Sequence, residues 1–419
     1  MTNMHMDVWG AALNLQLFAT QTTTLNAEGN DLSPEMKTFY EKRLLDNAEP
    51  NLVHDQFGDK YPIPAGGGKT IEFRKYSPLD KATTPITEGV TPDGNKLNVT
   101  ASTATIAQYG DWIQLSDLLD LTAIDNNVLQ ATKLLGAQSG RTLDTVTREA
   151  LAGGTNVIYA PKVGADGTKT PVTSRSALDA TAKIDVDLIF RAARALKTMN
   201  ADKIDDSYVA IVHPDVSYDL MRSEEWIDAH KYATPDNIYQ GEIGKLGGVR
   251  FVESTEAKIW CGGNLAGNSR TLTVNNASGY SGATSVVFDG GTVAEDALIG
   301  RYVIINGTRA KVTDNTTTTL TLDTAVTCDD NAVIYPGEGG AEGLAVYATL
   351  VLGAHAYGLT EVTGGGLQHI VKQLGYGDDP LNQRSSCGWK ATKAVRRLVE
   401  EYMVRIESCS TFSATAAAN

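Results

Sequence analysis

The sequence predicts an α+β fold that carries a small inserted all-β domain, and three observations support this prediction. Strand and helix patterns alternate over residues 180–262, as in a mixed α/β or α+β unit. Composition changes at about Gly262, since residues 264–338 are rich in Thr, Asn, Gly and Val and hold five short strand-like segments. Strand and helix signals then resume at "GLAVYATLVLGAHAYGL". An all-β stretch between two mixed stretches is most simply a barrel or sandwich inserted at a surface loop.

Length and composition set the class of protein. A chain of 419 residues exceeds the size at which one core keeps growing, so we expect two or three domains. No run of about 18 apolar residues predicts a membrane span. The opening "MTNMHMDVWGAALNLQLFA" has no Lys or Arg ahead of its apolar patch, so we expect no secretory signal.

Charge and cysteine usage exclude further classes. The formal net charge of −14, from 36 basic and 50 acidic residues, disfavours tight sequence-independent binding of nucleic acid. Four scattered cysteines without a CxxC pair fit a reducing cytoplasm, with neither a disulfide framework nor a zinc site. No two histidines have the i, i+4 spacing of a metalloprotease helix, so we predict no metal ligand and no cofactor.

The N-terminal third predicts extended pieces that lack a core of their own. Residues 1–60 form an arm with one helix from Ser33 and Pro34, whose narrow apolar stripe needs a partner. "KTIEFRKY" and "KLNVTASTATIAQYGDWIQLS" predict two strands joined by about twenty residues. An isolated two-stranded ribbon is marginal in water, so we expect it to lie on another surface, which includes another copy of the chain.

A long helix is predicted from Asp125 to about residue 152, ended by Gly153 and Gly154. Its expected inward face comprises Val128, Ala131, Leu135, Ser139, Thr142, Val146 and Ala150.

Residues 180–262 predict a helix from Asp185, a buried strand in "SYVAIVHPD", a helix from Pro214, and a turn and strand in "GKLGGVRFVES". The segment "KAVRRLVEEYMVRIES" fits a helix through Val395 and Leu398, whereas its last seven residues alternate like a strand.

Three motifs could carry chemistry, and each is better explained by structure. "AGGGKT", Ala65 to Thr70, lacks the upstream glycine and the following helix of a phosphate-binding loop, which favours a plain turn. His213 lies between a strand and Pro214, which favours a structural role at the end of the strand. Cys387 in "SSCGW" lacks the signature of any cysteine protease family, so we favour a packed cysteine over a nucleophile.

Several segments together resemble the N-four-type family of tailed-bacteriophage major capsid proteins. They are "VAIVHPDVSYDLMRSEEW", "GEIGKLGGVRFVESTEAKIW", "YATLVLGAHAYG" and "DPLNQRSSCGWK", with a weaker match at "NLQLFA". The resemblance covers most of the chain outside 264–338.

This resemblance implies the Hong Kong 97-type phage capsid fold. The expected parts are an N-terminal arm (1–60), an extended β loop (61–110), a peripheral domain with the spine helix (111–179), an axial domain (180–263 and 339–375), the inserted domain (264–338), and a return to the peripheral domain with the C-terminus (376–419).

The implied function is self-assembly into hexamers and pentamers of an icosahedral head that encloses double-stranded DNA without sequence-specific binding. Portal and other head proteins, and scaffold or decoration proteins, are the further partners implied, with no membrane. The location implied is the virion capsid, assembled in the host bacterial cytoplasm. Two alternatives stay open, which are an encapsulin-like cellular shell and a cysteine hydrolase using Cys387.

We expect two groups of residues to make contacts between subunits. The first group is Lys69, Arg74 and Lys81, and the second group is Asp379, Asn382, Gln383 and Arg384. An isopeptide bond between Asn382 and Lys69, Lys75, Lys81 or Lys96 is a further possibility, since some shells are cross-linked in this way. Replacing Asn382 or Arg384 should harm assembly more than folding.

Overall fold

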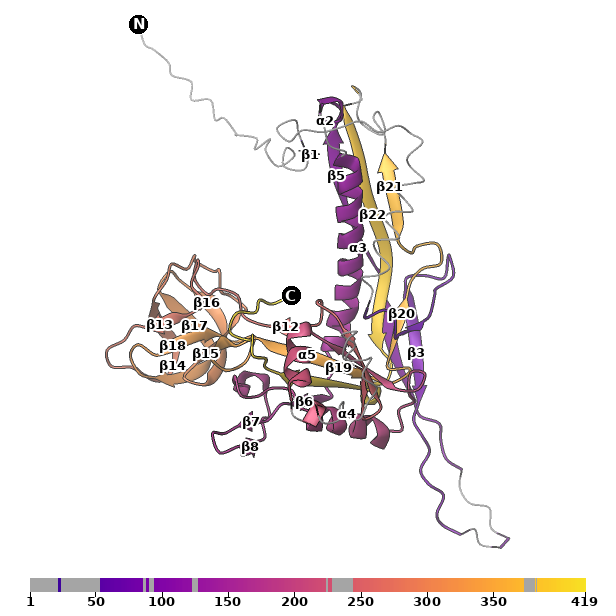
Figure 1. Ribbon diagram of the computed structural model, residues 1–419, viewed down its shortest axis with the longest axis horizontal. Helices are drawn as coiled ribbons and strands as arrows, with labels where there is room; N and C mark the ends of the chain where they lie inside the picture. The colour runs from indigo at the N-terminus through magenta and orange to yellow at the C-terminus, as the bar shows by residue number, and fades with distance from the viewer. Residues whose placement is uncertain are drawn as a thin grey trace.

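The computed structural model describes residues 22–23, 53–85, 88–89, 94–122, 127–223, 225–227, 244–372, 381 and 383–419. Figure 1 shows four parts: an elongated unit built on one long helix, a mixed unit across its lower end, a small barrel at one side, and a thin ribbon that projects away.

The elongated unit is a six-stranded sheet covered by the long helix α3, Asn127–Ala152. Its central strand is β22, Arg384–Arg397, which pairs over ten residues with β5, Ala107–Ser116. The remaining strands are β1 (Thr22–Thr23), β2 (Asp59–Lys60), β20 (Tyr357–Thr360) and β21 (Gln368–Lys372). The short helix α2, Asp117–Thr122, follows β5.

Alternation along β22 decides which face meets the helix. Cys387, Trp389 and Ala391 point to α3 and form a core with Ala131 and Leu135, because successive side chains of a strand face opposite sides. The predicted long helix is confirmed, and at about 1.5 Å per residue it spans about 39 Å.

In the second half of α3, the buried face differs from the face predicted from the sequence. Leu143 and Thr147 are buried, whereas Thr142 and Val146 are only half-buried. Residues that precede β2 cover this side of α3 through hydrogen bonds to its buried polar groups. The sequence could not show this second partner.

The mixed unit is a seven-stranded sheet with the order β10-β11-β9-β19-β23-β6 and β12 beside β19. The strands are β6 (Val157–Tyr159), β9 (Tyr208–Val212), β10 (Lys245–Leu246), β11 (Val249–Glu253), β12 (Ile259–Trp260), β19 (Val346–Leu352) and β23 (Met403–Ser408). Every residue of β9, β19 and β23 is buried, as expected for strands covered on both faces.

Helices α4, Val186–Thr198, and α5, Pro214–Met221, pack with this sheet. Asp185 caps α4 by accepting a hydrogen bond from Leu188 N–H at 2.9 Å, and Ile189, Ala193 and Leu196 are buried. The helices and strands predicted over 185–253 are thus confirmed. His213 ends β9 and accepts a hydrogen bond from the Asp215 amide at 3.2 Å, which is the structural role expected.

The chain passes between the two sheets more than once. After β19 it enters the six-stranded sheet through β20, β21 and β22, and it then returns to the seven-stranded sheet as β23. The expected domain boundaries, which include the one at residue 376, stay predictions. Which sheet a strand joins depends on pairing partners that are far away in the sequence, and local sequence patterns carry no information about these partners.

Helix is the wrong alternative for 395–402. β22 continues to Arg397, a single 3₁₀ turn covers Glu400–Tyr402, and β23 begins at Met403. Pairing of Val395 with Leu359 and of Ala394 with Thr360 stabilises the extended conformation there, since strand propensity depends strongly on cross-strand packing.

The inserted all-β domain is a closed six-stranded barrel. Its strands are β13 (Leu272–Val274), β14 (Tyr280–Asp289), β15 (Tyr302–Ile305), β16 (Thr308–Asn315), β17 (Thr319–Cys328) and β18 (Val333–Pro336). The sequence predicts five strands because "RYVIINGTRAKVT" is one unbroken strand-like run, whereas the structure divides it into β15 and β16. Asn306 and Gly307, with φ of 47° and 77°, form the two-residue turn that joins β15 to β16, and Asn-Gly is typical of such hairpins.

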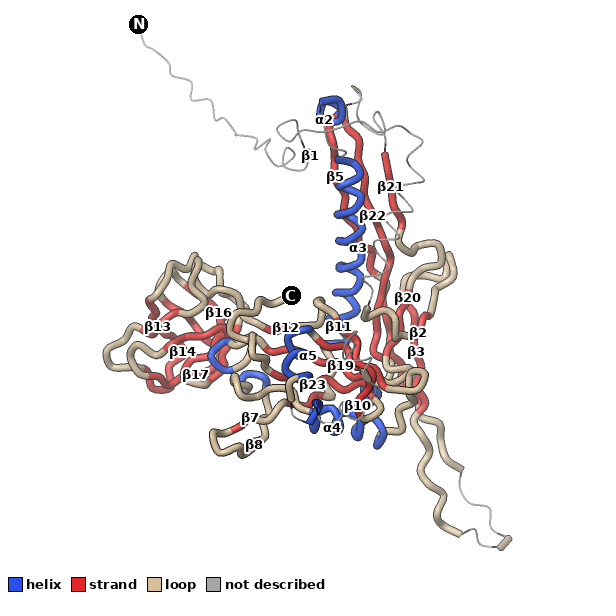
Figure 2. The backbone as a smooth tube through the Cα atoms, viewed as in Figure 1, coloured by secondary structure: helices blue, strands red, loops and turns tan. Residues whose placement is uncertain are grey.

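Smaller elements complete the chain. A two-stranded ribbon joins β3 (Thr70–Tyr76) to β4 (Val99–Thr105), and a short hairpin joins β7 (Lys162–Val163) to β8 (Lys169–Thr170). Two 3₁₀ turns cover Arg175–Ala177 and Ala341–Gly343. The expected arm helix from Ser33 lies outside the described residues. Figure 2 shows that loops, rather than helices, join the barrel and the ribbon to the body.

Candidate functional site

The β3–β4 ribbon exposes apolar side chains where it leaves the body of the subunit. Tyr76 and Leu97 are 60% and 70% exposed, and Leu79 and Val99 are also exposed. The strands of the ribbon lie beside the body, whereas the described part of the loop that joins them projects away from both sheets (Figure 1), and the described chain leaves these four side chains exposed. Apolar side chains gathered on one projecting element indicate an interaction surface.

The base of the ribbon is fixed to its own subunit. Lys75 Nζ lies 3.1 Å from Glu401 Oε2, and Arg396 donates to Ser102 Oγ at 2.7 Å. The Phe73 ring meets Tyr61 edge-on, with 5.2 Å between ring centres. The ribbon therefore leaves the body in a defined direction. The turn before it, at "AGGGKT", leads straight into β3, so the phosphate-loop alternative is wrong.

The first group of predicted contact residues lies on this ribbon. Lys69 is exposed beside β3, and its carbonyl oxygen accepts a hydrogen bond from Ile106 N–H at 2.9 Å. Arg74 is exposed and pairs with Glu72 at 2.7 Å. Lys81 is exposed on the loop beyond the ribbon. The three side chains are thus spread along one projecting element.

Two residues of the second group, Gln383 and Arg384, lie at the opposite end of the six-stranded sheet. Gln383 accepts a hydrogen bond from Asp117 N–H through its carbonyl oxygen at 3.0 Å, and Arg384 pairs with Ser116 where β22 begins. Asp379 and Asn382 lie outside the described residues. Within one subunit, Gln383 and Arg384 do not meet the first group, since β22 runs the length of the elongated unit between them (Figure 1).

A buried polar cluster, which sequence reasoning missed, binds the root of the arm to the spine helix. His54 Nδ1 lies 2.7 Å from Asp144 Oδ2, and both side chains are fully buried. Asp55 accepts a hydrogen bond from Thr147 Oγ1 at 2.5 Å and pairs with Lys393. Three distant segments meet here, so no local motif could have revealed the cluster.

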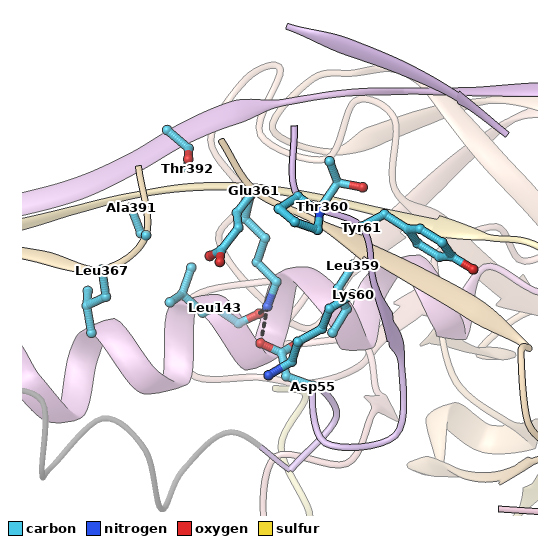
Figure 3. A pocket seen from close by; sticks show the side chains of 13 residues that line it. Asp55, Lys60, Tyr61, Leu143, Leu359, Thr360, Glu361, Leu367, Ala391 and Thr392 are labelled. Atoms are coloured by element: carbon cyan, nitrogen blue, oxygen red, sulfur yellow. Dashed lines mark hydrogen bonds and ion pairs between the residues drawn. The ribbon is translucent and has the colours of Figure 1, made fainter. Parts of the chain in front are cut away.

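Beside this cluster lies a pocket of about 420 Å³. Lys393 Nζ donates to the Asp55 carboxylate and to the Leu143 carbonyl oxygen, and Figure 3 shows Asp55, Leu143 and Glu361 around this pocket. Burial lowers the pKa of Lys393, although the neighbouring Asp55 opposes this effect. Leu359, Leu367 and other apolar groups supply most of the remaining wall. The pocket is a structural junction between arm root, helix and sheet.

Arginines from distant strands cap the C-terminal end of α3. The last turn contains no basic residue, yet Arg405 donates to the carbonyl oxygens of Ala152 and Gly154, and Arg397 donates to that of Ala150 at 2.6 Å. Carbonyl groups at a helix end have no partner within the helix and attract cations. These contacts join the two sheets through the helix.

Glu400 adds an acidic group to this junction. Burial alone would raise its pKa, but hydrogen bonds from the Thr155 amide and from Arg397 outweigh burial and hold the pKa of Glu400 below its ordinary value. A carboxyl group with a lowered folded pKa contributes stability that is present above its unfolded pKa and is lost as pH falls through the folded pKa.

We therefore expect Glu400→Gln to flatten the pH dependence of unfolding between about pH 5 and about pH 3. Urea denaturation across this range, compared with the wild type, provides the measurement. Glu295→Gln, at an exposed site on the barrel, serves as the control and should follow the wild-type profile. An unchanged profile for Glu400→Gln would contradict the assignment.

Cys387 is unsuited to nucleophilic chemistry. It is buried against α3, and burial raises the pKa of its thiol to about 11, whereas a reactive cysteine has a lowered pKa and access to solvent. We expect Cys387 to react with iodoacetamide at least about 100-fold more slowly in the native protein than in urea. Mass spectrometry of the labelled peptide measures this ratio, and rapid native labelling would revive the hydrolase alternative.

The described residues contain no group of three or more His, Cys, Asp or Glu side chains that could hold a metal ion. Among them, no helix is long and apolar enough to cross a membrane.

Comparisons with known proteins agree with this architecture. A family model described as "Phage capsid protein" matches residues 113–378, and the chain therefore belongs to this family. Comparison with curated proteins gave no match.

Solved structures show the fold. The chain is similar to the capsid protein of cyanophage Pam1, with 13% identity and a TM-score of 0.51 over 96% of this chain and 100% of that chain. It is also similar to that of cyanophage P-SCSP1u, with 14% identity and a TM-score of 0.50 over 86% and 88%. The fold is the Hong Kong 97-type capsid fold, as the resemblance in sequence implied.

Proposed function

We propose that this chain is the major coat subunit of a tailed-phage head, and that its copies form hexamers and pentamers of an icosahedral shell around double-stranded DNA. The observation that carries the proposal is the β3–β4 ribbon, which projects from the subunit with Tyr76 and Leu97 largely exposed. A monomer gains nothing from such an element, whereas a neighbouring subunit can bury it.

The charge of the chain fits a container. With a net charge of −14, the subunit can enclose DNA without binding it tightly, because tight non-specific binding depends on many Lys and Arg contacts to phosphates. Its role is structural rather than catalytic. It would act in the virion capsid after assembly in the host bacterial cytoplasm, with portal, other head, scaffold or decoration proteins as further partners.

The inserted barrel adds a second surface. It lies to one side of the mixed unit, apart from the ribbon (Figure 1), and its base is attached by Arg270, which donates to the carbonyl oxygen of Ala414 at 3.0 Å. A domain held in this way can contact neighbouring capsomers or other molecules at a fixed angle.

The two groups of contact residues belong to this proposal. Lys69, Arg74 and Lys81 would contact a neighbour from the ribbon and its loop, and Gln383 and Arg384 from the far end of the sheet. Asp379 and Asn382 are proposed as contacts from the sequence alone. The positions of the described residues at opposite ends of an elongated unit suit contacts with two different neighbours.

Expression of the full chain, followed by cryo-electron microscopy and sedimentation velocity, tests the proposal. Closed shells or capsomers support it, and a protein that stays monomeric at high concentration contradicts it. Shells purified from infected cells should contain DNA. Packaged enzyme in place of DNA would instead favour the encapsulin-like alternative.

A further inference from the structure

The outer face of helix α4 carries a row of positive side chains. Arg191, Arg194 and Lys197 are exposed and occupy every third position of this part of the helix. Residues three apart lie on neighbouring turns of one helix face, so the three charges form a stripe about 9 Å long at about 1.5 Å per residue. Asp187 is the only acidic residue of α4. The stripe is therefore opposite in sign to the chain as a whole, which carries a net charge of −14.

No group in the described part of the subunit neutralises this stripe. Other arginines of the mixed unit are held by carboxylates, as Arg175 is by Glu407 at 2.7 Å. The side chains of Arg191, Arg194 and Lys197 form no ion pair or hydrogen bond with the described residues. Like charges at this spacing repel one another. The helix dipole favours a cation in the last turn, where Lys197 lies, but it gives no reason for Arg191 near the middle of the helix.

A fourth cation lies close to the stripe. Phe190 precedes Arg194 by one turn on the same side of α4. A Cβ atom at Gly247 would lie 2.6 Å from the Phe190 ring, so the turn between β10 and β11 packs against α4 at this point, and Figure 2 shows β10 next to α4. Lys245, which is exposed at the start of β10, thus adds positive charge beside the stripe.

The inserted barrel carries the opposite charge. Residues 264–338 contain eight acidic and four basic side chains. The barrel stands at one side of the mixed unit, apart from α4 (Figure 1). An anionic partner is therefore attracted to α4 and repelled by the barrel.

The stripe suits the backbone of a nucleic acid. Duplex DNA carries one negative charge per about 1.7 Å of its axis, so a stripe about 9 Å long can meet several phosphates whatever the base sequence. The planar guanidinium group of arginine donates two parallel hydrogen bonds to a phosphate. Three or four such contacts give weak binding that depends strongly on salt, which is compatible with the acidic character of the whole chain.

We propose that the outer face of α4, with Arg191, Arg194, Lys197 and the neighbouring Lys245, faces the interior of the shell and contacts the backbone phosphates of the enclosed DNA. The inference rests on the proposed function, since a shell around DNA is what presents DNA to this face. The contacts are made to phosphates and are independent of base sequence. The acidic barrel points away from the DNA.

Binding of a short fluorescent DNA duplex to the unassembled full chain tests the contact. The triple variant Arg191→Gln, Arg194→Gln and Lys197→Gln keeps side chains that favour helix. It should lower the association constant more than about tenfold at about 50 mM salt. The slope of the logarithm of this constant against the logarithm of salt concentration should become shallower by about 2.7, because each lost phosphate contact contributes about 0.9. Circular dichroism reports that the variant is folded.

A variant with scattered replacements is the matched control. Lys81→Gln, Lys311→Gln and Lys390→Gln remove the same total charge from exposed positions on the loop beyond the ribbon, on the barrel and on β22. Its association constant should stay within about twofold of the wild type. An equal loss of affinity in the two triple variants would show that binding follows net charge, and it would overturn the site on α4.

Chemical labelling tests which way α4 faces. The four native cysteines are buried, so a bulky maleimide polymer reacts with a cysteine introduced at the surface. Lys197→Cys should react more than about tenfold more slowly in closed shells than in the free subunit, because reaction requires access to the thiol. Lys311→Cys, on the barrel, should react at similar rates in both states. Equal rates for Lys197→Cys in shells and free subunits would overturn the inward position of α4.

These experiments separate the inference from the proposed function. A chain that forms no shells contradicts the proposed function itself. Shells that form, together with a triple variant that binds the duplex as tightly as the wild type, overturn only the contact at α4. If that variant binds DNA normally but fails to assemble, the stripe instead contacts an acidic surface of a second copy, and the DNA contact is likewise overturned.

Discussion

Replacing Arg405 with methionine should lower the free energy of unfolding of the unassembled subunit by about 3 kcal/mol. Arg405 is 6% exposed, and its guanidinium donates to Glu407, which is fully buried, at 2.8 Å. It also satisfies the carbonyl oxygens of Ala152 and Gly154. Methionine fills similar space, so the loss comes from a carboxylate and helix-end carbonyls left buried without their partner.

Arg175 keeps this loss from being larger. It holds Glu407 through two hydrogen bonds of 2.8 and 2.7 Å, so the carboxylate retains one partner. Urea denaturation measures the change. Arg74→Met is the matched control, because Arg74 forms only an exposed pair with Glu72 and its loss should leave stability unchanged within error. Equal stability of the two variants would refute the structural role of Arg405.

The second large effect concerns assembly. We expect Leu97→Asp to reduce the assembled fraction more than about tenfold. A loss of about 1.4 kcal/mol in the free energy of each intersubunit contact lowers its association constant tenfold, and burying an unpaired carboxylate at the contact is costly. Leu97 is 70% exposed in the subunit, so its replacement should not affect folding.

Leu97→Met is the matched variant and should assemble like the wild type, because it keeps an apolar side chain of similar volume. Sedimentation velocity at one protein concentration measures the assembled fraction, and urea denaturation confirms that both subunits fold. Equal assembly of the two variants would show that the loop beyond the ribbon lies outside the interface.

Local sequence patterns predicted the helices and strands well where one buried face or one start or end signal defines the element. Asp185 and Pro214 mark the starts of α4 and α5, and Gly153 follows the end of α3. Each signal depends on a few neighbouring residues, so it can be recognised without the rest of the chain. The change of composition at Gly262 likewise indicated the barrel.

Prediction was poorer where partners are distant in sequence. The strand from Val395 to Arg397 looked helical because its pairing with β20 is invisible locally. Among the residues expected at intersubunit contacts, Lys69, Arg74 and Lys81 are exposed on the ribbon and its loop. The buried pair of His54 with Asp144 joins residues 90 apart in the sequence, so no local pattern could predict it.

By itself, the sequence determined the α+β class, the long helix, the inserted all-β domain and the resemblance to phage capsid proteins, because periodicity, caps and composition act over short distances. Only the tertiary structure decided which strands share a sheet, and that strands far along the chain supply the arginines at the end of α3. Each of these depends on contacts between segments up to some 250 residues apart, and the free energy of such contacts exists only once the chain is folded.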